Sequence, residues 1–333
     1  MFKRWCRRHY INWRAERFFN KRSEHSARRI LFVREREAKY FYHGLLDWIP
    51  RHWPEAAKWI EVQPLPCKNV DWSSIGTFYA WLQDPVHERS PAVYAEARDA
   101  EARCRQHAIP ITNPVDVLSN SVRSRMLNLM AGSGIRVPRA VEIDDWDTFA
   151  TGLGGLSLPI IVRPAWGHGK AMHLVRDRWD LTDDVRSAFK ESVAVEFIDV
   201  KDDDNLYRKY RYVMIGSKGF PRHMLASYDW NTYGGTYVEK PAIRTEEKAY
   251  IQNPDPHHDQ LDAVRRRLGF DVVGFDYGVD RNGTLVVWEA NPFPDLEYVE
   301  NPIFPYKSPM TNRLFRALLT FHFERAGIPL PDR

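Results

Sequence analysis

The alternation of apolar and polar positions is clearest between residues 272 and 294, VVGFDYGVDRNGTLVVWEANPFP. β-Branched and aromatic residues alternate up to a polar stretch at 280–283 and resume at Leu285. This pattern predicts two antiparallel strands joined by a tight turn. If the loop holds an even number of residues, paired positions sum to 563, and Asp276 lies opposite Val287.

The same hairpin is predicted to carry a group of oxygen ligands on one face. Because side chains alternate along a strand, Asp276, Val287, Glu289 and Asn291 should project to one side. Asp276 is then diagonal to Glu289, at about 7–8 Å, within reach of shared metal ions. Such oxygen ligands suit Mg²⁺ carrying nucleotide phosphates. An isolated surface carboxylate is usually just solvated, but Glu289 interrupts the apolar run LVVWEAN, where an unpaired charge costs several kcal/mol.

Upstream, strand patterns alternate with helix patterns. This alternation predicts a parallel, doubly wound α/β domain from Ile30 to Leu118. Its predicted elements are strands at 30–33, 58–65, 77–82 and 109–112, and a helix at 91–108.

The second half continues with mixed elements and one long aperiodic segment. Residues 228–258 follow neither period and are rich in glycine, proline and polar residues, which indicates a loop or a lid over substrate. The other predicted elements are helices at 120–130, 260–268 and 311–326, and strands beginning at 135, 158, 173, 192 and 207.

Composition is that of an ordinary globular protein of about two domains. The 333 residues are 44% hydrophobic and 28% charged, and no run of 18 apolar residues occurs. The N-terminus lacks the apolar region of a secretory signal. Cys6, Cys67 and Cys104 have no metal-type spacing, which favours reduced thiols in a cytoplasm.

Charge is concentrated in a basic arm at residues 1–29. The arm holds ten Lys/Arg and two Glu, a net +8 against +4 for the whole chain, so the other 304 residues sum to −4. Phe2, Trp5, His9 and Trp13 fall at helical spacing between arginines. We expect this stripe to pack on its own domain or on a partner in a homodimer. Contact with a membrane or an acidic peptide is the alternative, and no nucleic-acid module accompanies the charge.

The motif at the hairpin resembles the metal-binding end of the ATP-grasp superfamily, whose members include carboxylate–amine ligases. It consists of Asp276, then Glu289 thirteen residues later, then Asn291-Pro292. The resemblance covers residues 113–301, where the other pieces follow in family order. It implies an α/β fold, α+β in its C-terminal part, with a nucleotide site between two subdomains. Residues 30–118 would be a pre-ATP-grasp-like domain and 119–333 the ATP-grasp domain, with a glycine-rich lid near 138–190.

The resemblance also implies which residues contact ATP. A cation on the helix near residue 123 and one ending the strand at 163 would touch phosphates, beneath a loop whose glycines allow close backbone approach. An acidic residue and the next two would meet the adenine, and a loop aspartate the ribose. The candidates are Arg123, with Arg125 as its competitor, and Arg163, Gly167, His168, Gly169, Lys170, Glu196, Phe197, Ile198 and Asp203.

Catalysis is expected from two cations on one further strand and from a histidine on the next. Lys209 and Arg211 share a strand face, where they repel each other unless an anion lies between them, and the resemblance places them at the γ-phosphate. His223 could touch phosphate or substrate, although a lone histidine is often structural. Some family ligases carry an arginine two residues before the metal aspartate, where this chain has Gly274.

The implied reaction is ATP- and Mg²⁺-dependent ligation of a carboxylate to an amine through an acyl phosphate. Asp276, Glu289 and Asn291 would hold the metal at the β- and γ-phosphates. The alternatives are a small-molecule kinase on the same fold, or a non-catalytic nucleotide-binding or scaffold protein that works through its basic arm.

Overall fold

The computed structural model describes residues 2–24, 26–36, 43–166, 171–294, 296 and 304–331. The helices are α1 (Phe2–Ser23), α2 (His43–His52), α3 (Val86–Arg89), α4 (Pro91–Gln106), α5 (Arg123–Met130), α6 (Trp146–Gly152), α7 (Asp183–Ala188), α8 (Pro241–Gln252), α9 (His258–Leu268) and α10 (Lys307–Ala326). The strands are β1 (Arg29–Arg34), β2 (Ile60–Pro64), β3 (Ile75–Ala80), β4 (Ile111–Thr112), β5 (Ala140–Ile143), β6 (Ile160–Pro164), β7 (His173–Val175), β8 (Ser192–Glu196), β9 (Tyr207–Ile215), β10 (Lys218–Ser227), β11 (Val272–Val279) and β12 (Leu285–Asn291).

The first sheet, sheet A, is parallel with strand order β2-β1-β3-β4. Its strands are almost entirely buried, as expected for a parallel sheet covered on both faces. Leu31 and Phe78 pack with α4 on one face, whereas Ile30 and Phe32 pack with α2 and α10 on the other. The predicted parallel α/β arrangement is therefore confirmed.

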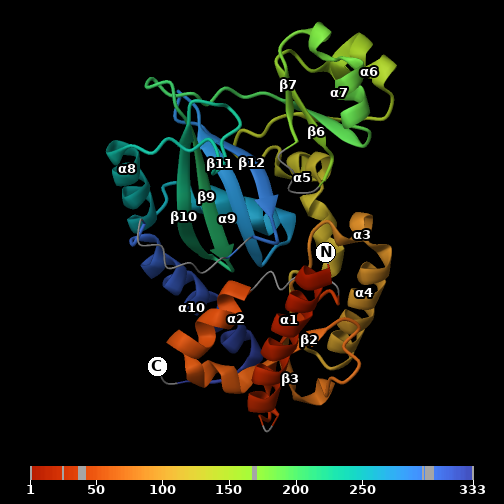
Figure 1. The fold of residues 1–333 in the computed structure, drawn as a ribbon, viewed down its shortest axis with the longest axis vertical. Coiled ribbons are helices and arrows are strands. Elements are labelled where there is room, and N and C mark those ends of the chain that lie inside the picture. The colour runs from red at the N-terminus through yellow and green to blue at the C-terminus, as the bar shows by residue number, and fades with distance from the viewer. Residues whose placement is uncertain are drawn as a thin grey trace.

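The C-terminal helix α10 connects sheet A with strands β9 and β10 from the second half of the chain (Figure 1). Its His322 ring lies 5.2 Å from the rings of Phe32 and Tyr79 in sheet A. The same apolar cluster includes Val213 and Ile215 of β9. Because α10 packs on elements from both halves of the chain, it fixes their relative position.

The other two sheets are antiparallel. Sheet B has the order β10-β9-β11-β12, and sheet C has the order β5-β8-β6-β7. Sheet C packs on α6 and α7 with an apolar core of its own, and it stands at one end of the molecule in Figure 1. The segment before β5 crosses to sheet B, where Arg136 pairs with Val286. The two antiparallel sheets are thus linked directly.

In helix α1, the side chains that the structure describes pack on the domain through residues outside the predicted stripe of Phe2, Trp5, His9 and Trp13. Phe19 is buried, and the Asn20 side chain exchanges two hydrogen bonds with the backbone of Val62 in β2. Trp13, however, is 51% exposed. The expectation that this stripe packs on its own domain is therefore wrong at Trp13.

Residues 228–258 contain helix α8, which sequence periodicity missed. Pro241 occupies the first turn, where a missing N–H costs nothing. Only Ile243, Glu247 and Ile251 are buried along the helix, so its apolar stripe is narrow and carries a carboxylate. The prediction of a loop therefore holds for residues 228–240 and 253–257 and is wrong for α8 between them.

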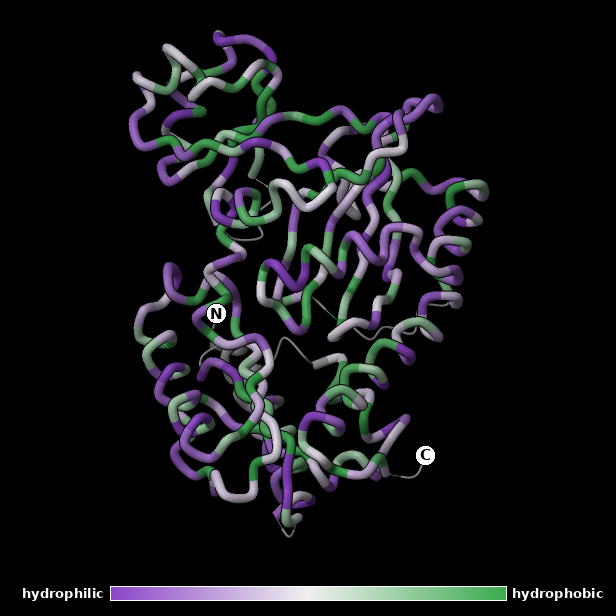
Figure 2. The backbone as a smooth tube through the Cα atoms, turned by 180° about the vertical axis from the view of Figure 1, so that it is seen from behind, coloured by the Kyte–Doolittle hydropathy of each residue, from purple (hydrophilic) through white to green (hydrophobic). Residues whose placement is uncertain are grey.

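Hydropathy follows this architecture (Figure 2), with hydrophobic stretches along the strands and hydrophilic ones at many surface turns. Over the residues described, no helix has both the length and the apolar character needed to cross a membrane.

Candidate active site

Four of the predicted site residues stand in one row across sheet B. His223 of β10 pairs with Arg211 of β9, Arg211 pairs with Asp276 of β11, and Asp276 pairs with Glu289 of β12. Cross-strand partners lie at about 4.5–5.5 Å between Cβ atoms. The row therefore brings a histidine, a cation and two carboxylates together on one face.

The register of the hairpin differs from the prediction. Val279 pairs with Leu285, so the loop holds five residues, and the register shifts again between Asp276 and Tyr277. Tyr277 pairs with Val287, which leaves Trp288 as an extra residue in a β-bulge. Asp276 is therefore directly opposite Glu289 and not opposite Val287. Val287 packs instead with Tyr277 in the core on the other face.

The anion between Lys209 and Arg211 is the Asp276 carboxylate. Arg211 Nη2 donates a hydrogen bond to Asp276 Oδ2 at 3.0 Å, and its Nε contacts Oδ1. Lys209 Nζ lies 3.5 Å from Oδ2. Asp276 is buried, and these two cations compensate its charge.

Gly274 leaves room for the Arg211 guanidinium. A Cβ atom at position 274 would lie 3.3 Å from Arg211 Nη1 and 3.0 Å from Pro294 Cβ. Arg211 thus reaches from β9 into the space beside Gly274 of the neighbouring strand.

Helix α5 directs Arg123 toward the same face and leaves Arg125 outside. The buried Arg123 places Nη2 3.7 Å from Glu289 Oε2 and donates from Nη1 to the Trp288 carbonyl at 3.3 Å. Burial lowers the pKa of Arg123, while Glu289 opposes that shift. Arg125 is exposed and donates to Ser119 Oγ. The structure therefore favours Arg123 of the two candidates.

Arg163 adds a fourth cation from sheet C. Its pKa is lowered to about 9, mainly by burial and also by the charge of Arg123, while Glu289 and Asp276 oppose the shift. The side chain therefore stays charged at neutral pH. Its buried Nε has no hydrogen-bond partner among the described residues, so the donor is available for an anionic ligand.

His223 is held neutral. Burial lowers the pKa of its imidazole well below the usual value, and the cations of Arg211, Arg222, Lys307 and Lys209 lower it further. A neutral imidazole offers one donor and one acceptor nitrogen, which suits contact with a substrate group rather than charge compensation.

The residues predicted to meet the adenine lie at the end of β8. Glu196 Oε2 accepts a hydrogen bond from the Arg139 backbone N–H at 3.1 Å, and its Oε1 lies 3.7 Å from Arg136 Nη2. Phe197 is half-buried with its ring perpendicular to that of Trp230, and Ile198 is buried. The Glu196 carboxylate thus ties β8 to the segment before β5, and its contact with adenine stays a prediction.

Among the three loop aspartates, Asp202 and Asp204 both pair with Arg208. Asp203 is exposed and donates its backbone N–H to Asp202 Oδ1. The contact of Asp203 with ribose stays a prediction. The predicted phosphate loop, Gly167, His168, Gly169 and Lys170, lies outside the described residues.

Asp84 is a candidate site residue that sequence reasoning missed. It is buried just beyond the carboxyl end of β3, and its charge acts on Arg123. The nearby Trp81 ring lies 6.1 Å from Phe293, which follows β12. The carboxyl edge of sheet A therefore faces the Glu289 end of sheet B. An Asp-Pro dipeptide directly after an apolar strand was the available signal.

The donor set fits a hard cation. Asp276, Glu289 and Asn291 supply carboxylate and amide oxygens, the ligands that Mg²⁺ prefers. Asn291 is buried, and its Oδ1 accepts the Phe293 backbone N–H at 2.7 Å. No group of three or more His, Cys, Asp or Glu converges within the described part of the chain. A metal here would rest on two carboxylates, on the Asn291 amide oxygen and on oxygens of a phosphate substrate.

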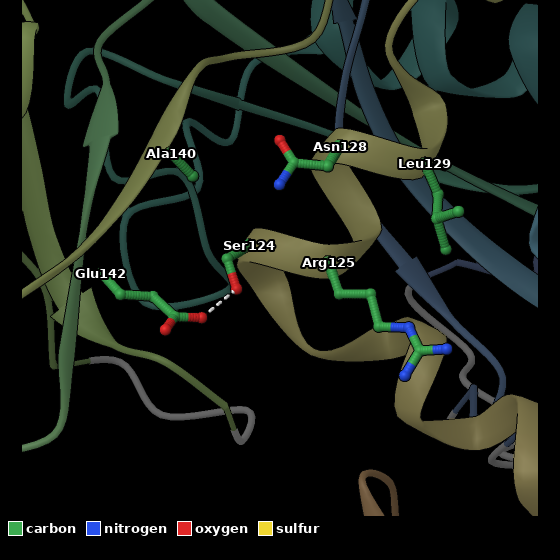
Figure 3. Close-up of a pocket in the computed structure, with 6 residues that line it drawn as sticks. All are labelled: Ser124, Arg125, Asn128, Leu129, Ala140 and Glu142. Atoms are coloured by element: carbon green, nitrogen blue, oxygen red, sulfur yellow. Dashed lines mark hydrogen bonds between the residues drawn. The ribbon is translucent and has the colours of Figure 1, made fainter.

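A separate open pocket of about 520 Å³ lies between α5 and β5 (Figure 3). It is lined by Ser124, Arg125, Asn128, Leu129, Ala140 and Glu142. Ser124 Oγ donates to Glu142 Oε1 at 2.5 Å across it. None of the predicted ATP or metal contacts lines this pocket except the disfavoured Arg125.

Comparison with known proteins finds likeness in structure only. No family model and no curated protein matches the sequence. The ATP-grasp ligase PsnB, complexed with precursor peptide PsnA2 and AMPPNP, matches with a TM-score of 0.54 and 13% identity over 89% of this chain and 98% of that one. The D-alanine–D-alanine ligase of Bacillus anthracis, complexed with ATP, matches with a TM-score of 0.56 and 16% identity over 90% and 97%. The macrocyclase MdnC of Microcystis aeruginosa, bound to precursor peptide MdnA, matches with a TM-score of 0.54 and 11% identity over 87% and 99%.

Proposed function

This chain has the ATP-grasp fold, and from that premise we propose that it is an ATP- and Mg²⁺-dependent carboxylate–amine ligase. The observation that carries the proposal is the direct pairing of Asp276 with Glu289, within one row that includes Arg211. Nucleotide and Mg are present together in a solved PsnB structure. We therefore assign ATP and Mg²⁺ to this face of sheet B.

Electrostatics support an anionic substrate here. Arg123, Arg163, Lys209 and Arg211 carry four positive charges around two carboxylates of sheet B, Asp276 and Glu289, and the buried Asp84. Transfer of the γ-phosphoryl group spreads negative charge over its oxygens, which fixed cations stabilise. When bound, Mg²⁺ would neutralise charge on the β- and γ-phosphates.

The chain's own residues then have separate tasks. Arg211 and Lys209 orient the γ-phosphate while an oxygen of the substrate carboxylate attacks its phosphorus and the bond to the β-phosphate oxygen breaks, which releases ADP. An amine nitrogen next attacks the acyl carbon, the bond from that carbon to the phosphate oxygen breaks, and the amine proton passes to solvent. Neutral His223 can accept a hydrogen bond from a substrate N–H or O–H group.

Trapping of the acyl phosphate tests the proposal. The protein is incubated with ATP, Mg²⁺, hydroxylamine and a panel of amino acids, small acids and peptides. Peptides belong in the panel because PsnB and MdnC were solved with precursor peptides. We expect hydroxamate and ADP in equal amounts with at least one acid. A stable phosphorylated product without hydroxamate would identify a kinase instead, and no nucleotide binding at all would leave a scaffold role.

A further inference from the structure

The outward face of helix α1 is an exposed surface of aromatic and cationic residues. We define the arm face as Tyr10, Trp13, Arg14, Arg17 and Lys21, which are all exposed. Their spacing of three and four residues places them in one stripe. We propose that the arm face binds an acidic peptide segment of the substrate beside the entrance to the active site. This inference rests on the proposed function.

The aromatic residues of the arm face are organised by their neighbours. The rings of Tyr10 and Trp13 stack at 6.2 Å between centroids. The Arg14 guanidinium lies 5.8 Å from the Tyr10 ring, and that of Arg17 lies 5.3 Å from the Trp13 ring. Because these contacts are on the ring faces, the arginine N–H groups stay available to carboxylates.

The cations of the arm face are not compensated within the described chain. Arg14, Arg17 and Lys21 form no ion pair there, whereas the nearby Glu16 turns inward to Arg34, with Oε1 2.6 Å from Nη2. The inward side of α1 is also committed, since Phe19 is buried. The helix therefore presents positive charge outward on an anchored support, which is complementary to an acidic ligand.

The arm face extends toward the active site. Asn20 bonds to Val62 in the middle of β2, and Glu16 pairs with Arg34 at the carboxyl end of β1. The N-terminal end of α1 therefore lies nearer than its C-terminal end to the carboxyl edge of sheet A. Tyr10 lies about 9 Å beyond Glu16 at 1.5 Å per residue. Figures 1 and 2 place this end of the chain level with the junction of sheets A and B, the junction where Asp84 acts on Arg123.

The chemistry favours a peptide over a lipid surface or a nucleic acid. An interfacial helix needs a broad apolar face, and among the α1 residues whose exposure the structure describes, 10 and 12–23, only Tyr10 and Trp13 are large exposed hydrophobics. Base stacking needs free ring faces, but Trp13 is flanked by Tyr10 and Arg17. A flexible acidic chain can reach the arginines edge-on without displacing either ring.

Binding to the full-length protein tests the inference. The probe is a fluorescein-labelled peptide in which Glu and Ala alternate, and the control peptide has Gln in place of Glu. Binding is measured by fluorescence polarisation at low and at high salt. We expect only the Glu peptide to bind, and its affinity should decrease as the salt concentration rises. Arg14→Glu and Arg17→Glu should each weaken binding roughly fivefold. Arg267→Glu, an exposed position on α9, should leave it unchanged.

Three results would overturn the inference: equal binding of both peptides, unchanged binding by the Arg14→Glu/Arg17→Glu double variant, or binding of the arm only to phosphatidylserine vesicles or single-stranded DNA. Point variants are needed because deletion of residues 1–29 would also remove buried Phe19. Hydroxamate formation separates the two proposals. If the peptide binds but no acid gives hydroxamate, only the ligase proposal is rejected. If small acids give hydroxamate but the peptide does not bind, only the proposal for the arm face is rejected.

Discussion

Asp276 and Glu289 face each other across β11 and β12, and the carboxylate of each is held by a different cation. Asp276 contacts Arg211 of the neighbouring strand, whereas Glu289 contacts Arg123 of α5. Two elements far apart in the sequence, β9 and α5, therefore converge on one carboxylate pair, and this convergence motivates the first two predictions.

Removal of either carboxylate charge should abolish turnover without unfolding the protein. We expect Asp276→Asn and Glu289→Gln each to lower Mg²⁺-dependent ADP release by at least about a hundredfold, because each loses charge that the metal requires. Melting temperature and Mg²⁺ titration of nucleotide binding measure the two effects separately. Full activity in both variants would show that the metal binds elsewhere.

Arg123 and Arg125 should differ in their effect on nucleotide binding. Arg123 is buried beside Glu289, and Arg125 is exposed two residues later on the same helix. We expect Arg123→Met to weaken ADP binding about tenfold, because a charge-assisted phosphate contact is lost, and Arg125→Met to leave it unchanged. Calorimetry measures both. Arg123→Lys should keep part of the affinity, and the opposite ranking of the two Met variants would contradict the assignment.

A methyl group at position 274 should displace Arg211. The added Cβ would lie 3.0 Å from Pro294 Cβ and 3.3 Å from Arg211 Nη1, so the guanidinium would have to move away from Asp276. We expect Gly274→Ala to lower kcat about tenfold or more with a smaller effect on nucleotide affinity. Gly152→Ala is the matched control, since nothing lies within 4 Å of its added Cβ. Unchanged kcat in Gly274→Ala would show that Arg211 does not act on the transferred group.

The free energy of unfolding should decrease as pH rises, because the buried Glu101 carboxyl loses its proton. Burial raises the pKa of this carboxyl from 4.5 to about 7, although it accepts the Val115 backbone N–H at 2.6 Å and lies near Arg105. Between pH 4.5 and 7 the folded state keeps a proton that the unfolded state has lost, so the free energy of unfolding decreases as pH rises. The full effect is about 3 kcal/mol.

The Glu101→Gln variant isolates that effect. Gln keeps an acceptor oxygen for Val115 and cannot ionise, so its unfolding free energy should change less between pH 5 and pH 8 than that of the wild type. Urea denaturation at the two pH values gives the difference. Parallel pH dependence in both proteins would locate the titration in another group.

Sequence periodicity was sufficient for much of the fold. Continuous apolar strands between helices predicted the parallel sheet A, because strands buried on both faces cannot alternate. Sequence periodicity failed at α8. Its buried stripe, Ile243, Glu247 and Ile251, is too narrow and too polar to produce a clear helical pattern of hydrophobic residues. The Trp13 stripe misled for the opposite reason, since aromatic spacing shows which residues share a face but not whether that face is covered.

The residue types of the candidate site were determined by the sequence alone: carboxylates in an apolar hairpin, two cations on one strand, and a glycine where a side chain could stand. Their meeting was decided by tertiary structure. The Trp288 bulge adds one residue to β12 and turns Val287 to the opposite face from Glu289, a shift that no local pattern encodes. Asp84, Arg123 and Glu289 converge only because sheet A packs end-on against sheet B, and contacts between distant segments depend on the packing of the whole core.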